Sequence, residues 1–297
     1  MDGYRIEDKL MNAGIVDIPE AEYRKHPSLS QSGIKLLLPP SCPALFRWRM
    51  DNPEPHKKVF DFGNAAHKEV LGIGQPVRYI QGKTAKGEPS DGWASKYAQD
   101  RAAEARAAGE IPLLESQRGV IEGMAAALRA HPLAAKLLDP EHGKPEQALF
   151  HTDPDSGIGL RGRLDWLPNA SSNGRMVLPD YKTAASADAE SFANAAASYG
   201  YVIQDPFYRD LVTGAGLADE VDFVFIVQSK EPPFLVNVIE LDAEAVRIGR
   251  GLIRKAINLY KACLENDYWP GYGSDVELVS VPVWFQRLHE DFTEMSL

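Results

Sequence analysis

Acidic and basic side chains gather in residues 162–182, where two short apolar segments are joined by a polar turn at residues 169–174. Asp165 lies in the first segment, and Asp180 and Lys182 lie at the end of the second. On a β-strand, residues two apart point to the same face, so Asp180 and Lys182 project together, and pairing of the strands brings Asp165 beside them. Buried charges are costly unless they are paired or functional. The pattern therefore predicts a divalent cation between the carboxylates, with the lysine beside the reacting group.

This hypothesis assigns a role to each charged side chain. Asp165 and Asp180 offer hard oxygen ligands, which suit Mg²⁺ or Mn²⁺ better than a soft metal. Such a cation lowers the pKa of an attacking water and neutralises a phosphate. Lys182 would orient or help deprotonate that water and stabilise the developing charge. Glu146, just before an apolar segment, is a candidate additional acid, and Arg161 and Arg163 are candidate phosphate contacts.

The surrounding pattern predicts the elements that position these residues. Strand-length apolar segments occur at residues 146–152, 159–167, 176–181, 221–228 and 234–241. Helical periodicity is found at residues 62–72, 93–109, 114–138, 184–211 and 242–266. The order of helices, three strands, helix, two strands and helix predicts an α/β fold with a central mixed β-sheet flanked by helices and an α-helical N-terminal half.

The same pattern divides the chain into three parts. We expect a loosely attached polar lead-in over residues 1–28, one domain over residues 29–270, and a wrapping C-terminal tail over residues 271–297. Within the domain, a helical half (29–140) precedes a catalytic sheet core (141–245) and a C-terminal helix (242–266).

Composition limits the classes of function. The chain has 297 residues, of which 44% are hydrophobic, and no apolar run approaches the roughly 20 residues that span a bilayer. The N-terminus has no signal pattern, which predicts a cytoplasmic protein without membrane contact. A net charge of −10 argues against a protein that coats nucleic acid by charge alone. It leaves room for an enzyme with a local basic groove.

The ordered set His67, Gly-Arg-Leu-Asp165, Asp180-Tyr-Lys182, Gln204 and Tyr208 resembles the PD-(D/E)XK nuclease superfamily. Within it, the set is most similar to the branch of RecE (exodeoxyribonuclease VIII) and RecB-type nuclease domains. Two earlier segments, Leu-Ser-Gln-Ser-Gly-Ile-Lys and Cys-Pro-Ala-Leu-Phe, are also similar to that branch, so the resemblance covers about residues 29–245. The residue before Asp165 is Leu164, so the literal Pro-Asp pair is absent there.

The resemblance implies a restriction-endonuclease-like core and a wider ligand set. It adds His67 and the backbone carbonyl of Tyr181 to the metal ligands, and imidazole is a ligand that Mn²⁺ tolerates. It also implies that Gln204 and Tyr208, which are four apart on one helix face, hold the nucleic-acid strand near the metal. The bland alternatives are a core histidine at position 67, an ordinary polar residue at 204 and a core aromatic at 208. Pro206 predicts a kink or an early break in this helix.

By the same resemblance, the chain is a metal-dependent exodeoxyribonuclease. It would resect linear double-stranded DNA ends to leave 3′ single strands for recombination by annealing. The resemblance also implies a phage or prophage origin in a bacterial host cell, a RecT-like annealing partner and a homo-oligomeric ring. The branches with an iron–sulfur cluster need four cysteines, and this chain has only Cys42 and Cys263. Two alternatives stay open, namely a structure-specific, restriction or repair endonuclease of the same fold, and a non-catalytic DNA-binding or assembly protein.

Overall fold

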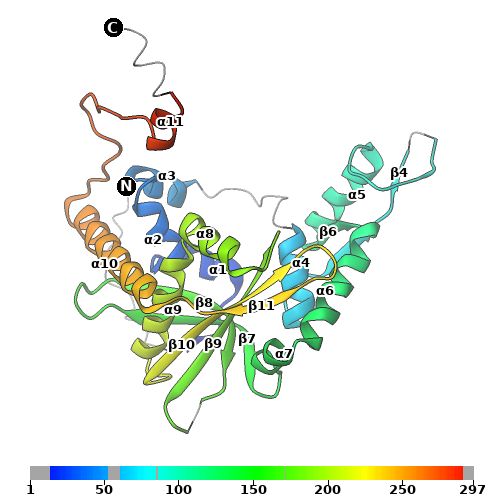
Figure 1. The fold of residues 1–297 in the computed structure, drawn as a ribbon, viewed down its shortest axis with the longest axis horizontal. Coiled ribbons are helices and arrows are strands. Elements are labelled where there is room, and N and C mark those ends of the chain that lie inside the picture. Colours follow the sequence, from blue (N-terminus) through cyan, green and yellow to red (C-terminus); the bar gives the residue numbers. More distant parts are fainter. Residues whose placement is uncertain (1–13, 53–60, 85, 171, 290–297) are drawn as a thin grey trace.

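Four strands of ten residues each form the centre of the fold (Figure 1), as seen in a computed structural model that describes residues 14–52, 61–84, 86–170 and 172–289. They are β7 (Gly143–Thr152), β8 (Gly159–Pro168), β9 (Arg175–Ala184) and β10 (Glu220–Ser229). β7 pairs antiparallel with β8, and β9 pairs in parallel with β10. Three short strands extend these pairs: β1 (Gly14–Val16), β2 (Leu29–Ser30) and β11 (Val236–Ile239). The sheet is mixed, as predicted.

The junction between β8 and β9 differs from the expected hairpin. The two strands follow each other in the chain, yet over their described residues they belong to separate hydrogen-bonded sets, which we call ladders. The first ladder has the strand order β1–β7–β8–β2, and the second has the order β11–β10–β9. β2 pairs in parallel with only the start of β8, at Leu160 and Arg161. The second half of β8 is left beside β9, where the backbone N–H of Tyr181 donates a hydrogen bond to the Asp165 side chain. Asp165 therefore lies at a seam between two ladders.

Helices cover both faces of this sheet. One face packs against α2 (Gln31–Leu37), α8 (Ala189–Tyr199), α9 (Tyr201–Gly214) and α10 (Ala243–Asn266). The other face packs against α4 (Asp61–Leu71), α6 (Arg118–Ala130) and α7 (Pro132–Leu137). Neighbouring residues of β10 belong to opposite faces, since Phe225 packs in the first cluster and Ile226 in the second. A strand buried on both faces is apolar almost throughout, which explains the sequence of β10.

The N-terminal half is less helical than predicted. Besides α3 (Pro43–Asp51) and α5 (Lys96–Ala107), it contains four short strands beyond β2. They are β3 (Val77–Ile80), β4 (Gly82–Lys83), β5 (Pro89–Ser90) and β6 (Ile111–Leu114). The helix expected over residues 114–138 begins later than predicted. The apolar residues of β6 precede it, and a short 3-10 turn lies between β6 and α6. With α5, the β4–β5 hairpin projects from the rest of the fold (Figure 1).

The helix expected over residues 184–211 is divided in two. The break falls at Gly200, which has a φ of +73°, a conformation that favours glycine. Pro206 lies inside α9 and leaves the Val202 carbonyl without its usual helical donor. That carbonyl faces α10 at Gly249, where a Cβ would lie only 1.8 Å from the Val202 oxygen. Gly249 therefore lets α10 approach the distorted turn of α9.

Both ends of the described chain contact the domain. In the described part of the lead-in, β1 pairs with β7 and α1 (Glu20–Lys25) follows it, while residues 1–13 lie outside the described residues. Just before the expected tail, the Trp269 ring stacks on Phe46 of α3 at 5.8 Å. In the tail, the Tyr272 hydroxyl donates to the Pro40 carbonyl at 2.9 Å, and the helix α11 (Val283–Leu288) has no buried residue. Residues 290–297 of the tail lie outside the described part. Among the helices of the described residues, none has the length and apolarity to cross a bilayer.

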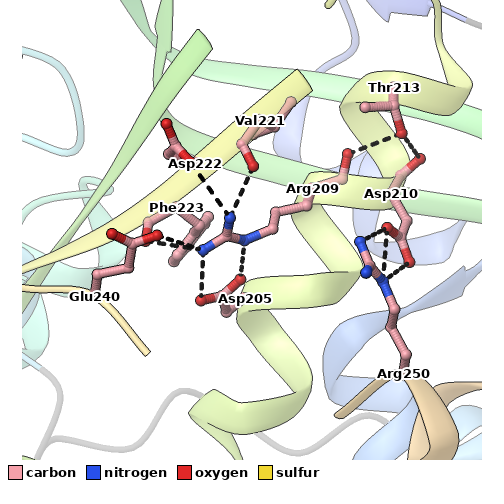
Figure 2. Close-up of polar contacts among 9 residues, drawn as sticks. All are labelled: Asp205, Arg209, Asp210, Thr213, Val221, Asp222, Phe223, Glu240 and Arg250. Carbon is pink, nitrogen blue, oxygen red and sulfur yellow. Dashed lines mark hydrogen bonds and ion pairs between the residues drawn. The ribbon is translucent and has the colours of Figure 1, made fainter. Parts of the chain in front are cut away.

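Two ion pairs fix α9, the helix that carries Gln204 (Figure 2). Asp205 has no exposed surface and pairs through both carboxylate oxygens with Arg209. Arg209 also donates to the Val221 carbonyl at 2.8 Å and to Glu240 at 3.2 Å. It therefore joins α9 to β10 and to the residue that follows β11. On the outer side of α9, Asp210 pairs with Arg250 of α10 at 2.8 Å.

We expect Asp205→Asn to lower the free energy of unfolding by about 3 kcal/mol, because the substitution leaves a buried guanidinium without its main counter-charge. The matched control is Asp210→Asn, which removes a half-exposed pair and costs under about 1 kcal/mol. Urea unfolding of both variants measures the difference. Equal effects would mean that burial adds nothing to the Asp205–Arg209 pair.

Candidate metal and nuclease site

Three potential metal ligands converge from three elements. His67 on α4, Glu146 on β7 and Asp165 on β8 each offer one ligand atom, and these atoms all lie within 4.8 Å of one another. The imidazole lies between the carboxylates, with Nε2 3.0 Å from Asp165 Oδ2 and Nδ1 3.4 Å from Glu146 Oε1. Each of the three side chains is mostly shielded from solvent, with 18–29% of its surface exposed. His67 is thus part of a polar cluster and is not a core histidine.

Glu146 owes its place to the register of β7 and β8. Pro145 pairs with Trp166 and Gln147 pairs with Leu164, so the register places Glu146 opposite Asp165, at a position where the backbone pairing is interrupted. Two like charges opposite each other destabilise a sheet. Glu146 also has a φ of +52°, which is strained for a residue with a side chain. Unfavourable charge and backbone strain at one position are features of functional sites.

A second pair of charges lies on β9. Asp180 is 3% exposed, and its Oδ1 accepts a hydrogen bond of 2.7 Å from the Gln204 side chain on α9. Its Oδ2 forms an ion pair with Lys182 Nζ. Gln204 therefore orients Asp180, and Asp180 orients Lys182. The predicted projection of Asp180 and Lys182 from one face of the strand agrees with this contact.

Tyr181, between these two residues, connects the groups. Its backbone N–H donates to Asp165 Oδ2 at 2.9 Å, across the seam. Its side chain is buried on the opposite face of the sheet, where the hydroxyl donates to Gln228 Oε1 at 2.6 Å. The Gln228 amide in turn donates to the Met124 carbonyl at 2.8 Å. Sequence reasoning missed Gln228, although a glutamine directly after the apolar run of residues 223–227 is a signal of a buried polar role. The ligand role of the Tyr181 carbonyl stays a prediction.

The electrostatics of the site reflect crowded negative charge. Burial, with the Asp165 charge added, raises the pKa of both Glu146 and Asp180. Burial also disfavours the charged forms of Asp165 and His67, but their mutual attraction outweighs it, so the pKa of Asp165 falls and that of His67 rises. For Lys182, attraction to Asp180 likewise overcomes burial and raises the pKa. An additional positive charge would relieve the two carboxylates whose pKa values are raised.

Tyr208 and the two arginines have structural contacts. The Tyr208 hydroxyl donates to the Arg163 carbonyl at 3.1 Å, and its ring packs so closely on Gly162 that a Cβ there would lie 2.5 Å away. Arg161 is 7% exposed and donates to backbone carbonyls of the lead-in, including that of Arg24 at 3.3 Å. Arg163 pairs with Glu20 of the lead-in. Both guanidinium groups thus contact the lead-in, which returns across β8, and their predicted phosphate contacts stay a prediction.

The donor set fits the cation that was predicted. One imidazole and two carboxylates provide three ligand atoms in one place, and carboxylate oxygens suit Mg²⁺ and Mn²⁺. The histidine makes Mn²⁺ the better match of the two. Asp180, also predicted as a ligand, contacts Gln204 through Oδ1 and Lys182 through Oδ2, and its ligand role stays a prediction. Glu146, predicted as an additional acid, lies in the cluster with His67 and Asp165.

The fold and the cluster define a nuclease domain of the PD-(D/E)XK superfamily. The chain belongs to the family described as "PDDEXK-like domain of unknown function (DUF3799)", whose profile matches residues 30–282. A similar fold is found in a crystal structure described as "Putative exonuclease" from Eubacterium rectale, with a TM-score of 0.56 at 11% identity over 92% of this chain and 98% of that chain. No protein of curated function matches the chain by sequence. Together these findings support a nuclease.

Proposed function

We propose that this protein is a metal-dependent exodeoxyribonuclease that hydrolyses phosphodiester bonds at the ends of linear duplex DNA. The observation that carries the proposal is the convergence of His67, Glu146 and Asp165 beside the Asp180–Lys182 pair. A structural site has no need for two like charges face to face next to a buried lysine. Hydrolysis of a phosphodiester needs a cation and a positioned proton donor or acceptor.

The residues present have distinct tasks in this reaction. His67, Glu146 and Asp165 would hold Mg²⁺ or Mn²⁺, which when bound acidifies water and neutralises the phosphate. Lys182 is held by Asp180 at the edge of the cluster, where its ammonium group can orient the attacking water and stabilise charge on the phosphate oxygens. Gln204 keeps Asp180 in place through its hydrogen bond. Burial of these groups strengthens each electrostatic interaction.

The finer features of the function rest on the resemblance to RecE-like nucleases. We propose that digestion leaves 3′ single strands for recombination by annealing. A RecT-like protein is the proposed partner, and a homo-oligomeric ring is the proposed assembly. A phage or prophage gene acting in the cytoplasm of a bacterial cell fits this role. The crystal structure described as "Putative exonuclease" supports the exonuclease part of the proposal through its fold.

The test uses linear duplex DNA labelled at the 5′ or the 3′ end, a closed circle of the same sequence, and Mg²⁺, Mn²⁺ or EDTA. We expect metal-dependent loss of the linear DNA with the circle intact, and the released label gives the polarity. Cutting of the circle would instead indicate an endonuclease. Folded protein that binds DNA but cleaves neither form with either metal would contradict the enzymatic proposal and favour a non-catalytic DNA-binding protein.

A further inference from the structure

A row of aromatic rings leads from the catalytic lysine to the surface. Lys182 Nζ lies 5.5 Å from the centre of the Tyr201 ring, and the Tyr201 ring lies 6.0 Å from that of Tyr199. Tyr201 is half-buried and stacks on the buried Phe192 at 5.8 Å. Tyr199 is 64% exposed. The inner ring is therefore fixed by the core, and the outer ring presents itself to solvent.

The junction between α8 and α9 sets the positions of the two tyrosines. Gly200 reverses the chain between them with its φ of +73°, and the start of α2 packs against this junction. Gln31 donates to the Gly200 carbonyl at 3.4 Å, and Lys35 Nζ donates to the Tyr199 carbonyl at 2.9 Å. A Cβ on Gly200 would lie 2.5 Å from the Lys35 side chain, so the lysine crosses directly over the glycine. The arrangement is thus held by contacts between three helices.

Lys35 brings a second positive charge to this place. Its Nζ donates to the Tyr199 carbonyl, so the ammonium group lies beside the exposed ring. Burial, with the neighbouring charge of Lys182 added, lowers the pKa of Lys35. Lys182 is already paired with Asp180, so Lys35 is the lysine of the two that can take a DNA phosphate. We name the four residues the aromatic–lysine strip: Lys35, Lys182, Tyr199 and Tyr201.

We propose that the aromatic–lysine strip binds one unpaired DNA strand, with a base stacked on Tyr199 and a backbone phosphate held by Lys35. Exposed aromatic rings next to cationic side chains are the means by which proteins bind single strands without reading their sequence. Inside a duplex both faces of a base are covered by its neighbours, so a base away from the end can stack on Tyr199 only when it is unpaired. The inference rests on the proposed function, because it places this strand at the nuclease site, and it adds the form of the substrate.

Binding is tested in the Asp180→Asn background, so that the DNA is not consumed. The probe is a single-stranded oligonucleotide with a terminal 2-aminopurine, whose fluorescence is quenched by stacking. We expect quenching with Tyr199 and with Tyr199→Phe. We expect Tyr199→Ala to lose the quenching and to bind roughly 5- to 100-fold more weakly, the range for loss of one stacked base. Replacement of Lys35 by Met should lower the salt dependence of binding by about 0.7 in log–log slope.

The matched control is Tyr268→Ala, which removes a tyrosine of similar exposure (67%) that follows α10, outside the strip. It should leave quenching and affinity unchanged. If Tyr199→Ala binds and quenches like its parent, or if no variant binds the probe, the inference is wrong even when the wild-type protein cleaves DNA. If Tyr199-dependent binding is found but the wild-type protein cleaves no DNA, the strip stands as a single-strand site and the proposed nuclease function fails.

Discussion

Replacing Asp180 by Asn should lower the rate of DNA cleavage by roughly 10³-fold or more, with DNA binding retained in the absence of turnover. The Asp180 charge holds Lys182 at the edge of the metal cluster, and an amide of the same shape cannot form that ion pair. The fold should survive, because an amide oxygen can still accept the Gln204 hydrogen bond and Asp165 still stabilises the charge of Lys182. Single-turnover cleavage of end-labelled duplex DNA, with near-UV circular dichroism as the check of folding, measures the effect.

Asp210→Asn is the matched control for this experiment. It makes the same chemical change on a half-exposed carboxylate of α9 that pairs with Arg250, away from the cluster. Its cleavage rate should stay within about twofold of wild type. A folded Asp180→Asn protein that cleaves at the wild-type rate would remove Asp180 from the site and with it the proposed role of Lys182.

The second large effect concerns Glu146→Gln. Without metal this variant should have the larger free energy of unfolding, and with metal the wild-type protein should have it. Without metal, the variant should be more stable than wild type by up to about 1 kcal/mol at pH 7.5, because one of two opposed carboxylates is gone. With Mn²⁺ at about 100 times its dissociation constant, the wild-type protein should gain about 2.7 kcal/mol, and the variant much less. Urea unfolding with Mn²⁺ and with EDTA measures both differences, and Glu244→Gln, an exposed pair with Arg247, serves as control.

The pH dependence of this difference follows from the raised pKa of Glu146. In the unfolded chain the carboxyl group loses its proton near pH 4.5, whereas the folded protein retains the proton to a higher pH. The charge penalty in the wild-type protein therefore grows as the pH rises above 4.5 and disappears below it. In EDTA, the variant and wild type should be equally stable near pH 4 and differ at pH 7.5. A constant difference across this range would show that charge repulsion is not its cause.

The sequence predicted those parts of the site that depend on spacing along one element. Asp180 and Lys182 are two apart on a strand, and the structure brings them together on one face, as that spacing requires. Asp165 was placed beside them correctly, although through a contact of its side chain with the Tyr181 backbone and without a hairpin ladder. Gln204 points at the site from α9, as its helical spacing suggested, and contacts Asp180 there. The role of Gln204 and Tyr208 in holding a nucleic-acid strand stays a prediction.

The parts that depend on contacts between distant segments could not be read from the sequence. The position of Glu146 opposite Asp165 follows from the register of β7 and β8, which no local pattern sets. The contact of Arg161 with the lead-in could not be predicted, because it requires the lead-in to return across β8. Pro206 stays inside α9, where Gly249 of α10 leaves room for the Val202 carbonyl that the proline deprives of its donor, and the helix breaks instead at Gly200. In each case a second segment decides the role of the residue.

The seam between β8 and β9 has a consequence for how ion binding and fold stability are linked. His67, Glu146 and Asp165 belong to α4 and to the ladder of β7 and β8, whereas Asp180 and Lys182 belong to the ladder of β9 and β10. Along this seam the Tyr181 N–H bond to Asp165 takes the place that a row of backbone hydrogen bonds has inside a ladder. A cation bound to Asp165 would favour the ionised form of this carboxylate, which both ladders share through the Tyr181 hydrogen bond. Amide hydrogens of both β8 and β9 should therefore exchange more slowly when the metal is bound. The proposed metal site would then also stabilise the contact between the two ladders.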